Sequence, residues 1–175
     1  MRYLYFISFL LLMGLISSCI KNPIKEAFHK DPDPKVFSCK INGNTYVPYN
    51  GSIIFSPVSA IVSYNKFNFT YTIRISTSLK VNNSLTKHLD MTINNVTTGE
   101  GVYLFNKDNR AIYSDSKYYT TDMAGHGSVT ITHFHPASTY MTGTFKFNAP
   151  DIQNPTDSIR VTGGHFNISD LNKQY

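Results

Sequence analysis

This chain of 175 residues has no tryptophan and only two cysteines, Cys19 and Cys39. A framework of several disulfides, which often stabilises small secreted domains, is therefore excluded. Lys and Arg number 16 against 11 for Asp and Glu, and they are scattered singly, so the chain lacks the basic stripe of a nucleic-acid-binding protein. We expect no nucleic-acid partner, and a fold that depends on a hydrophobic core rich in Phe and Tyr, with 12 of each.

Carboxylates are also sparse, because Glu26 and Glu100 are the only glutamates and the aspartates lie mostly in turn-like contexts. Glycoside hydrolysis needs two carboxylates about 5–10 Å apart in a cleft, and nothing in the sequence marks such a pair. Residues 125–129 lack the spacing of a nucleophile elbow, and no glycine-rich phosphate loop is present. The sequence therefore predicts a protein that is not an enzyme and that needs no cofactor.

Only one long apolar run occurs, and it lies at the start of the chain. Residues 3–16 follow the basic Arg2 and lead into two serines and Cys19. A basic start, an apolar stretch of about 7–15 residues and small residues before a cleavage point are typical of a secretory signal peptide. The run is shorter than the roughly 20 residues of a transmembrane helix. We therefore predict a signal peptide over residues 1–18, and an uncleaved N-terminal anchor is the alternative.

The four residues 16–19, Ile-Ser-Ser-Cys, resemble a bacterial lipobox. The resemblance implies cleavage before Cys19 and diacylation of that residue, with palmitate as a typical chain. Residues 19–35 are then a lipidated cysteine and a flexible tether, because three prolines and several charges oppose regular structure there. With Cys19 acylated, Cys39 has no partner for an intramolecular disulfide. We expect a lipoprotein anchored to a membrane of the cell envelope, the outer membrane, and facing the periplasm or the cell surface.

Residues 36–175 are predicted to form a single β domain. Strict alternation of apolar and polar residues over 67–76, beginning with Phe67 and Phe69, predicts a half-buried strand. Further strands are predicted at residues 36–41, 45–49, 53–55, 59–63, 89–93, 102–105, 111–113, 118–121, 128–132, 141–147 and 158–168. About ten strands at this spacing predict an all-β, antiparallel β-sandwich, and a small β-barrel is the alternative.

Two short segments predict details of strand pairing. Asn-Gly at residues 42–43 supplies the two positive-φ residues of a type I′ hairpin, which places Cys39 opposite Tyr46 on an apolar face. Cys39 is therefore expected to be a buried structural thiol. In the strand at residues 158–168 the apolar positions change from odd to even numbers across Gly-Gly at 163–164, which predicts a β-bulge there.

Three segments in this order resemble a group of uncharacterised, β-rich lipoproteins of the Gram-negative cell envelope, described only as domains of unknown function. They are Phe-Ser-Cys-Lys-Ile-Asn-Gly-Asn-Thr-Tyr at 37–46, Gly-Ser-Val-Thr-Ile-Thr at 127–132 with Gly-Thr-Phe-Lys-Phe-Asn-Ala at 143–149, and Val-Thr-Gly-Gly-His-Phe at 161–166. The resemblance covers residues 36–168. It implies a sandwich-like domain on a lipid tether, and it supplies no catalytic residues.

Two histidines are the only candidate metal ligands. His133 and His135 share a face if their strand continues through both, and two imidazoles with a third ligand can bind zinc or copper. Pro136 instead predicts a turn at this point, and no Cys or Glu-x-x-His motif accompanies the pair. His133 and His135 are therefore weak candidates, and no bound metal is expected.

Four tyrosines, Tyr113, Tyr118, Tyr119 and Tyr140, are the candidate ligand surface, because their rings can stack on sugars or peptides. The alternative is that they are ordinary half-buried strand residues. The expected partners are a membrane, through the N-terminal lipid, and an unknown envelope protein or glycan. The sequence favours a non-catalytic interaction or structural module, and a glycan- or small-ligand-binding module is the alternative. A flat apolar patch or open edge strand favours the first, and a cleft with clustered exposed tyrosines favours the second.

Overall fold

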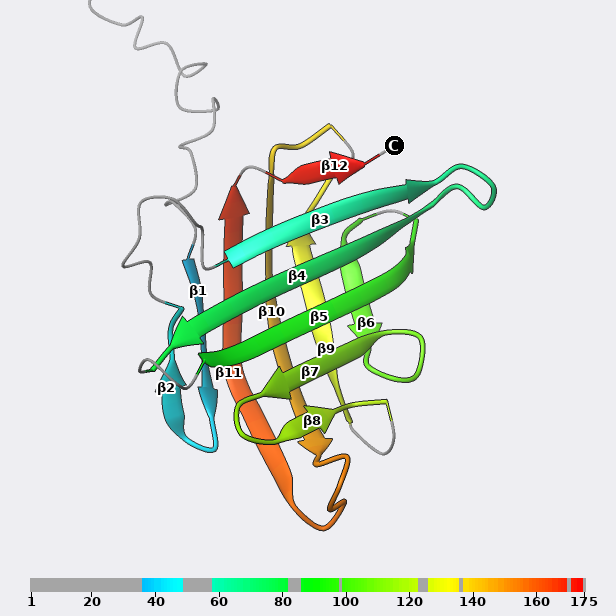
Figure 1. Cartoon of the computed structure of the whole chain (residues 1–175). Coiled ribbons are helices and arrows are strands. Elements are labelled where there is room, and N and C mark those ends of the chain that lie inside the picture. The colour runs from blue at the N-terminus through cyan, green and yellow to red at the C-terminus, as the bar shows by residue number, and fades with distance from the viewer. Residues whose placement is uncertain are drawn as a thin grey trace, which may run out of the picture. The chain divides into compact units, whose positions relative to one another are not determined.

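The computed structural model describes residues 36–48, 58–81, 86–97, 99–122, 126–135, 137–169 and 171–174, and these form two six-stranded sheets. The sheets face each other and are not closed into a barrel (Figure 1). The predicted β-sandwich is confirmed, with twelve strands in the described residues. The predicted signal peptide, Cys19, the tether and the predicted strand at residues 53–55 lie outside the described residues. Within those residues, no helix has the length and hydropathy needed to cross a membrane.

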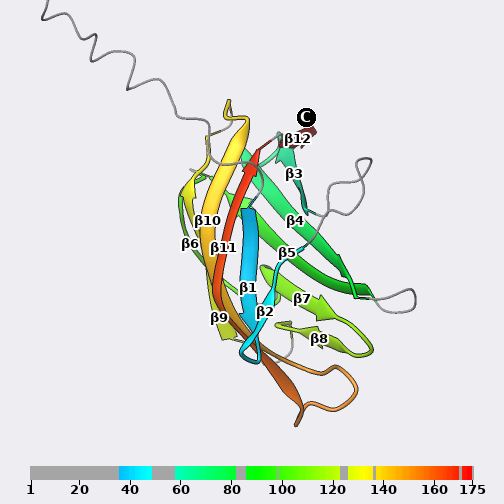
Figure 2. The same ribbon diagram turned by 90° about the vertical axis from the view of Figure 1, so that its left-hand side faces the viewer.

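The first sheet has the strand order β2-β1-β11-β10-β9-β6, and the second has the order β12-β3-β4-β5-β7-β8. The first comprises β1 (Val36–Ile41), β2 (Asn44–Tyr46), β6 (Gly101–Leu104), β9 (His126–His133), β10 (Tyr140–Pro150) and β11 (Ser158–Ser169). The second comprises β3 (Val58–Asn65), β4 (Thr70–Lys80), β5 (Thr86–Val96), β7 (Arg110–Ser114), β8 (Tyr118–Thr120) and β12 (Asn172–Gln174). Figure 2 shows the two sheets from the side as two layers.

The two predicted details of pairing are confirmed. In the β1–β2 hairpin, Asn42 and Gly43 have φ values of 50° and 83°, and Cys39 pairs with Tyr46. In β11, Gly163 has a φ of 58°, and the register against both β1 and β10 shifts by one residue at this point. An extra residue in a strand produces this double shift. The bulge brings Ile159 and Val161 onto the same buried face as Phe166 and Ile168.

The prediction of a strand beginning at Phe67 is wrong, because β4 begins at Thr70. Phe67 and Phe69 belong to a four-residue turn, residues 66–69, and their side chains are 88% and 73% exposed. Asn65 pairs with Thr70, and the Asn65 Oδ1 accepts a hydrogen bond of 3.0 Å from the Phe67 N–H. This side-chain contact closes the turn, although the apolar alternation of the sequence continues through it.

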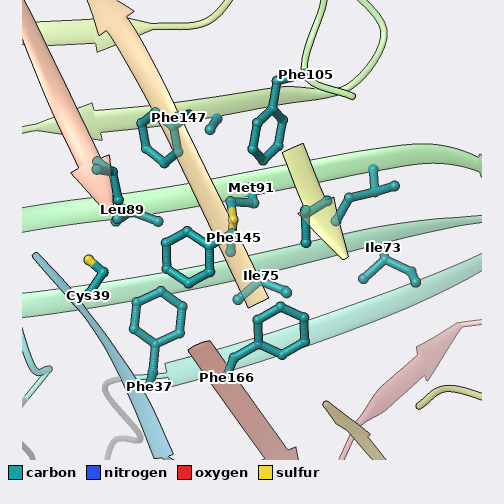
Figure 3. Close-up of a cluster of buried hydrophobic side chains, with 14 of the residues drawn as sticks. Phe37, Cys39, Ile73, Ile75, Leu89, Met91, Phe105, Phe145, Phe147 and Phe166 are labelled. Carbon is teal, nitrogen blue, oxygen red and sulfur yellow. The ribbon is translucent and has the colours of Figure 1, made fainter. Parts of the chain in front are cut away.

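Both sheets contribute to one core of buried apolar side chains (Figure 3). From the first sheet, Phe37, Phe145 and Phe166 lie together, with the rings of Phe37 and Phe145 5.1 Å apart between centroids. They face fully buried aliphatic residues of the second sheet, Ile73, Ile75, Leu89 and Met91. Cys39 is 3% exposed within this core, as predicted.

Two glycines let aromatic rings of neighbouring strands lie directly over the backbone. At Gly143 on β10, an added Cβ would meet the Phe166 ring and the Thr130 carbonyl oxygen. At Gly164 on β11, it would lie 2.6 Å from the ring of Phe145. Each ring thus covers a glycine of the adjacent strand and replaces the side chain that is missing there.

Candidate functional site

Three tyrosine rings gather in a small cleft at the end of the sandwich that holds β2, β7 and β8. The cleft has a volume of about 190 Å³, and Tyr46, Tyr113 and Tyr119 are among its lining residues. Tyr113 and Tyr119 lie opposite each other in the β7–β8 pair, with ring centroids 6.0 Å apart. Tyr46 meets Tyr113 edge-to-face at 6.4 Å. The three rings therefore connect the first sheet to the second.

Hydrogen bonds fix the orientation of two of these phenols. The Thr77 hydroxyl donates to the Leu89 carbonyl over 3.0 Å, which leaves the Thr77 oxygen to accept from the Tyr46 hydroxyl, also at 3.0 Å. The Tyr113 hydroxyl donates to Asp115 Oδ2 over 3.2 Å. With their hydroxyls engaged in this way, Tyr46 and Tyr113 form rigid walls of the cleft.

The electrostatics of the cleft keep its phenols neutral. Burial raises the pKa of Tyr46 above the usual tyrosine value. Burial also raises the pKa of Tyr113, and the negative charge of Asp115 raises it further. Phenols in this state offer ring faces and hydroxyl groups at physiological pH, but they do not act as bases. The cleft therefore presents neutral aromatic side chains at physiological pH.

The size and rim of the cleft limit what it can hold. Sites for drug-sized ligands span about 300–1,000 Å³, so a cleft of about 190 Å³ fits only a smaller molecule or one ring of a larger one. Polar residues of the lining include Asn44, Lys87 and Asp115. The Asp115 carboxylate also accepts the Lys117 N–H over 2.9 Å within its own turn. The cleft thus combines an aromatic wall with a polar rim.

The structure divides the four tyrosines that the sequence groups as one surface. Tyr113 and Tyr119 are buried and line the cleft, whereas Tyr118 on β8 is 41% exposed and is not among the cleft residues. Tyr140 lies at the start of β10 and stacks on His133 with a centroid distance of 4.3 Å. The alternation of side chains along β8 explains the first separation, because Tyr118 and Tyr119 point to opposite faces. Tyr46 is a member of the cleft that sequence reasoning missed, although the predicted Cys39–Tyr46 pairing already places it on the inner face.

The two candidate metal ligands have different local contacts. His133 Nδ1 lies 3.7 Å from Glu100 Oε1, and its Nε2 lies 3.4 Å from the Ser138 hydroxyl. His135 Nδ1 accepts a hydrogen bond of 3.1 Å from the Ala137 N–H, so this ring helps to close a turn. Among the described residues, no group of three or more His, Cys, Asp or Glu side chains is placed to hold a metal ion.

Exposed apolar side chains concentrate on two elements that sequence reasoning did not identify as binding surfaces. One is the turn at residues 66–69, with Phe67 and Phe69. The other is β6, where Val102 and Leu104 are each 65% exposed. β6 ends the strand order of the first sheet and pairs with β9 alone among the described strands. Both surfaces consist of apolar residues that lie next to turns in the sequence. The alternation of apolar and polar residues does not show, however, which of these side chains stay exposed to solvent.

Comparison with known proteins gives a family and no individual relative. Residues 62–168 match the sequence family described as "Domain of unknown function (DUF6252)". No curated protein and no solved structure matches the chain. The matched region begins within β3 and ends within β11, so it covers most of both sheets.

Proposed function

This chain belongs to the DUF6252 family, and from its own residues we propose that it is a lipid-anchored protein of the Gram-negative cell envelope. We propose further that its β-sandwich acts as a non-catalytic interaction module. In this proposal Cys19 carries the lipid, residues 20–35 are the tether, and the domain faces the periplasm or the cell surface. The support for the anchor is the apolar run that leads into Ser-Ser-Cys.

The observation that carries the interaction role is the character of β6 as an edge strand. Edge strands expose unpaired backbone groups, and proteins usually protect them with charges, prolines, bulges or covering segments. β2 is polar at Asn44 and Thr45, β12 is Asn-Lys-Gln, and Tyr119 of β8 forms a bridge with Asp151. β6, with the sequence Gly-Val-Tyr-Leu, has neither a charge nor a proline, and it exposes Val102 and Leu104. On its open side the Leu104 carbonyl accepts a hydrogen bond of 3.2 Å from Asn109 Nδ2, so Val102 is the residue of this edge best placed to pair with an incoming strand.

Such an edge suits a partner that adds a strand. The backbone of an incoming extended segment can hydrogen-bond to the open side of a sheet, while alternate side chains contact apolar residues on one face. Val102 and Leu104 are two residues apart and therefore lie on the same face of β6. We propose that an envelope protein uses this edge, and that the tether raises its effective concentration near the domain.

Photocrosslinking in cells tests the interaction role. A photoreactive amino acid is placed at Val102 in the full chain, and a control is placed at Thr144, an exposed position in the interior of the same sheet. We expect a discrete crosslinked product when the photoreactive residue is at position 102 and no such product when it is at position 144. Replacing Leu104 by Lys in the chain with the photoreactive residue at position 102 should abolish the product. Equal crosslinking at both positions would contradict the proposal.

The anchor is tested separately by comparing the full chain with Cys19→Ala in a bacterial host. We expect the unchanged chain to fractionate with membranes and to show the mass of the acyl groups, and the variant to show neither. Identical fractionation without an acyl mass increment would refute the anchor but not the edge-strand contact.

The tyrosine cleft favours a second candidate function, the binding of a small ligand such as a monosaccharide. A ligand at 100 times its Kd stabilises the folded state by about 2.7 kcal/mol, so a panel of sugars can be screened by thermal unfolding. Tyr119→Ala should abolish any shift that is found, whereas Tyr118→Ala should preserve it, because Tyr118 lies outside the cleft. A shift that both variants retain would place the ligand elsewhere.

A further inference from the structure

We propose that the turn between β3 and β4 contacts the bilayer, with the rings of Phe67 and Phe69 inserted among the lipid headgroups. The inference rests on the proposed lipid anchor at Cys19, and it adds how the domain is oriented once it is anchored. The site is the turn itself, residues 66–69, and the occupant is a phospholipid surface.

The two phenylalanines are the most exposed large apolar side chains among those described. Phe67 is 88% exposed and Phe69 is 73% exposed. The turn projects beyond the body of the two sheets (Figure 1). Beside it lies an open hollow of about 750 Å³, whose lining includes Tyr64, Lys66 and Phe67. Segments that lie at the membrane–water interface bury Trp, Phe or Leu at the headgroup boundary and keep basic residues beside them, and Tyr is also frequent at this level.

The backbone of the turn shows that Phe69 is not there for the sake of the fold. Its φ is +57°, a conformation that Gly and Asn adopt readily and that is unfavourable for a bulky side chain. The turn is closed by other residues, since Asn65 Oδ1 accepts from the Phe67 N–H at 3.0 Å and Asn68 Oδ1 accepts from the Thr70 hydroxyl at 2.7 Å. An exposed aromatic ring in a strained conformation on a preorganised turn points to a contact outside the domain.

The strand topology gives the position of the turn relative to the start of β1. Val36, where the described chain begins, pairs with Asn167 near the end of β11. β12 follows directly after β11 and pairs in parallel with the end of β3, with Gln174 opposite Ser63. Figure 1 shows the start of β1 and the turn after β3 both in the upper part of the view, with the start of β1 at the left and the turn projecting at the right. The strands that hold the tyrosine cleft, β2, β7 and β8, lie in the lower part.

The length of the tether is compatible with this orientation. Residues 19–35 number 17, so the lipid and Val36 can be separated by at most about 60 Å. Within that radius the bilayer is present at a high effective concentration, and a weak insertion is enough to orient the domain. The tether and the turn together provide two points of attachment.

The shape of the turn favours a lipid surface over a protein partner. A specific protein interface requires about 1,000 Å² or more of complementary surface, which two rings on a projecting four-residue turn do not provide. A soft headgroup layer has no such requirement, because it deforms around the inserted rings. The single cation in the turn, Lys66, is too little for binding by charge alone. We therefore expect insertion that depends little on salt concentration.

The absence of tryptophan from the chain allows a direct test. Phe67→Trp introduces one fluorophore at the turn, and Tyr118→Trp introduces one at an exposed site on β8 as the matched control. Each acylated full-chain product is reconstituted into vesicles of phosphatidylethanolamine and phosphatidylglycerol, with or without brominated acyl chains. We expect blue-shifted emission that is quenched by the brominated lipid for Phe67→Trp, and water-like, unquenched emission for Tyr118→Trp.

A second variant separates insertion from folding. Phe69→Asn in the Phe67→Trp background should reduce the quenching substantially, while the midpoint of thermal unfolding stays the same or rises, because Asn suits the positive φ. Phe67→Ser with Phe69→Asn in the chain without tryptophan should still fractionate with membranes through its lipid.

The outcomes distinguish this inference from the proposed anchor. If the chain is acylated and bound to vesicles but the emission of the Phe67→Trp variant stays water-like, the turn does not contact lipid and the inference is overturned while the anchor stands. If no acyl group is found, an N-terminal histidine tag on vesicles with chelating lipids supplies the attachment, and the same quenching decides the question. Emission that shifts only when envelope proteins are added, and not with lipid alone, would assign the turn to a protein partner and overturn the inference.

Discussion

Alkaline pH should destabilise this domain through Cys39 before it affects the buried tyrosines. Burial raises the pKa of the Cys39 thiol from its ordinary value near 9 to about 12. The folded state therefore keeps the thiol proton over a range in which the unfolded chain releases it. The stability that this proton contributes is fully present below pH 9 and is lost progressively as the pH rises towards 12.

The size of the effect follows from the shift. Each pH unit across the window between the two pKa values lowers the free energy of unfolding by about 1.4 kcal/mol for a single group. Relative to pH 7, the loss that comes from Cys39 alone should be about 1 to 1.5 kcal/mol at pH 10 and about 2.5 to 3 kcal/mol at pH 11. Burial also raises the pKa values of Tyr46 and Tyr113. Because tyrosine ordinarily ionises near pH 10, the stability that their protons contribute begins to be lost as the pH approaches 10, about one pH unit later than that of Cys39.

Urea denaturation followed by far-ultraviolet circular dichroism measures this dependence between pH 7 and pH 10. The chain carries Cys19→Ala, so that Cys39 is its only thiol, and it is compared with the same chain carrying Cys39→Ala. The second variant should be less stable at pH 7, because it leaves a small cavity in the core. Between pH 9 and pH 10 it should nevertheless lose about 1 kcal/mol less than the parent, because the contribution of the tyrosines is common to both chains. Equal losses in the two chains over this interval would refute the assignment to Cys39.

Three further predictions concern other parts of the domain. Gly143→Ala should lower the free energy of unfolding by about 3 kcal/mol, because the added Cβ meets the Thr130 carbonyl and the Phe166 ring. Gly163→Ala should lower it by only about 1 kcal/mol, because Gly163 has free space around it and only its positive φ is unfavourable for Ala. A reversed order of the two losses in urea denaturation would contradict both explanations. Phe69→Asn should stabilise the domain by up to about 1 kcal/mol by relieving the positive φ, and a clear loss of stability would show that its ring packs on the fold. One equivalent of zinc should leave the melting temperature unchanged, and a rise that His133→Ala abolishes would instead establish a metal site.

The parts of the fold that were predictable from the sequence are those that local chemistry determines. The positive-φ pair Asn42-Gly43 sets the turn, and the turn sets the pairing of Cys39 with Tyr46. The change of phase around Gly163 likewise revealed the bulge, because a strand with one buried face cannot lose its register without an extra residue. In both places a few adjacent residues contain all the information.

The errors arose where distant parts of the chain decide the outcome. Alternation continues from Phe67 into β4, but only the pairing of Asn65 with Thr70 shows that the two rings lie in a turn. β12 is short, polar and parallel to β3, and it therefore has no periodic signal. These features depend on where neighbouring strands end, which the pattern of a single segment does not contain.

The candidate site was less predictable than the fold for a similar reason. Tyr113 and Tyr119 were predicted from the sequence as candidate ligand residues, but their contact with Tyr46 requires the two sheets to meet. The sequence also did not predict that β6 is an edge strand, because this depends on the order of the strands in the sheet and not on the residues of β6. Residue type can thus nominate side chains, while the topology determines which of them share a surface.

The position of β1 between β2 and β11 has a mechanical consequence for a domain attached by its N-terminus. Under the proposed anchor, a pull that reaches Val36 along the axis of β1 acts on a strand whose register with β11 runs from Val36–Asn167 to Ile41–Val161. Force in this direction loads the hydrogen bonds of the antiparallel ladder together, in shear, and does not open them one after another as it would from the far end of the strand. Under the proposed anchor, tension directed along β1 is therefore resisted by the whole β1–β11 ladder at once.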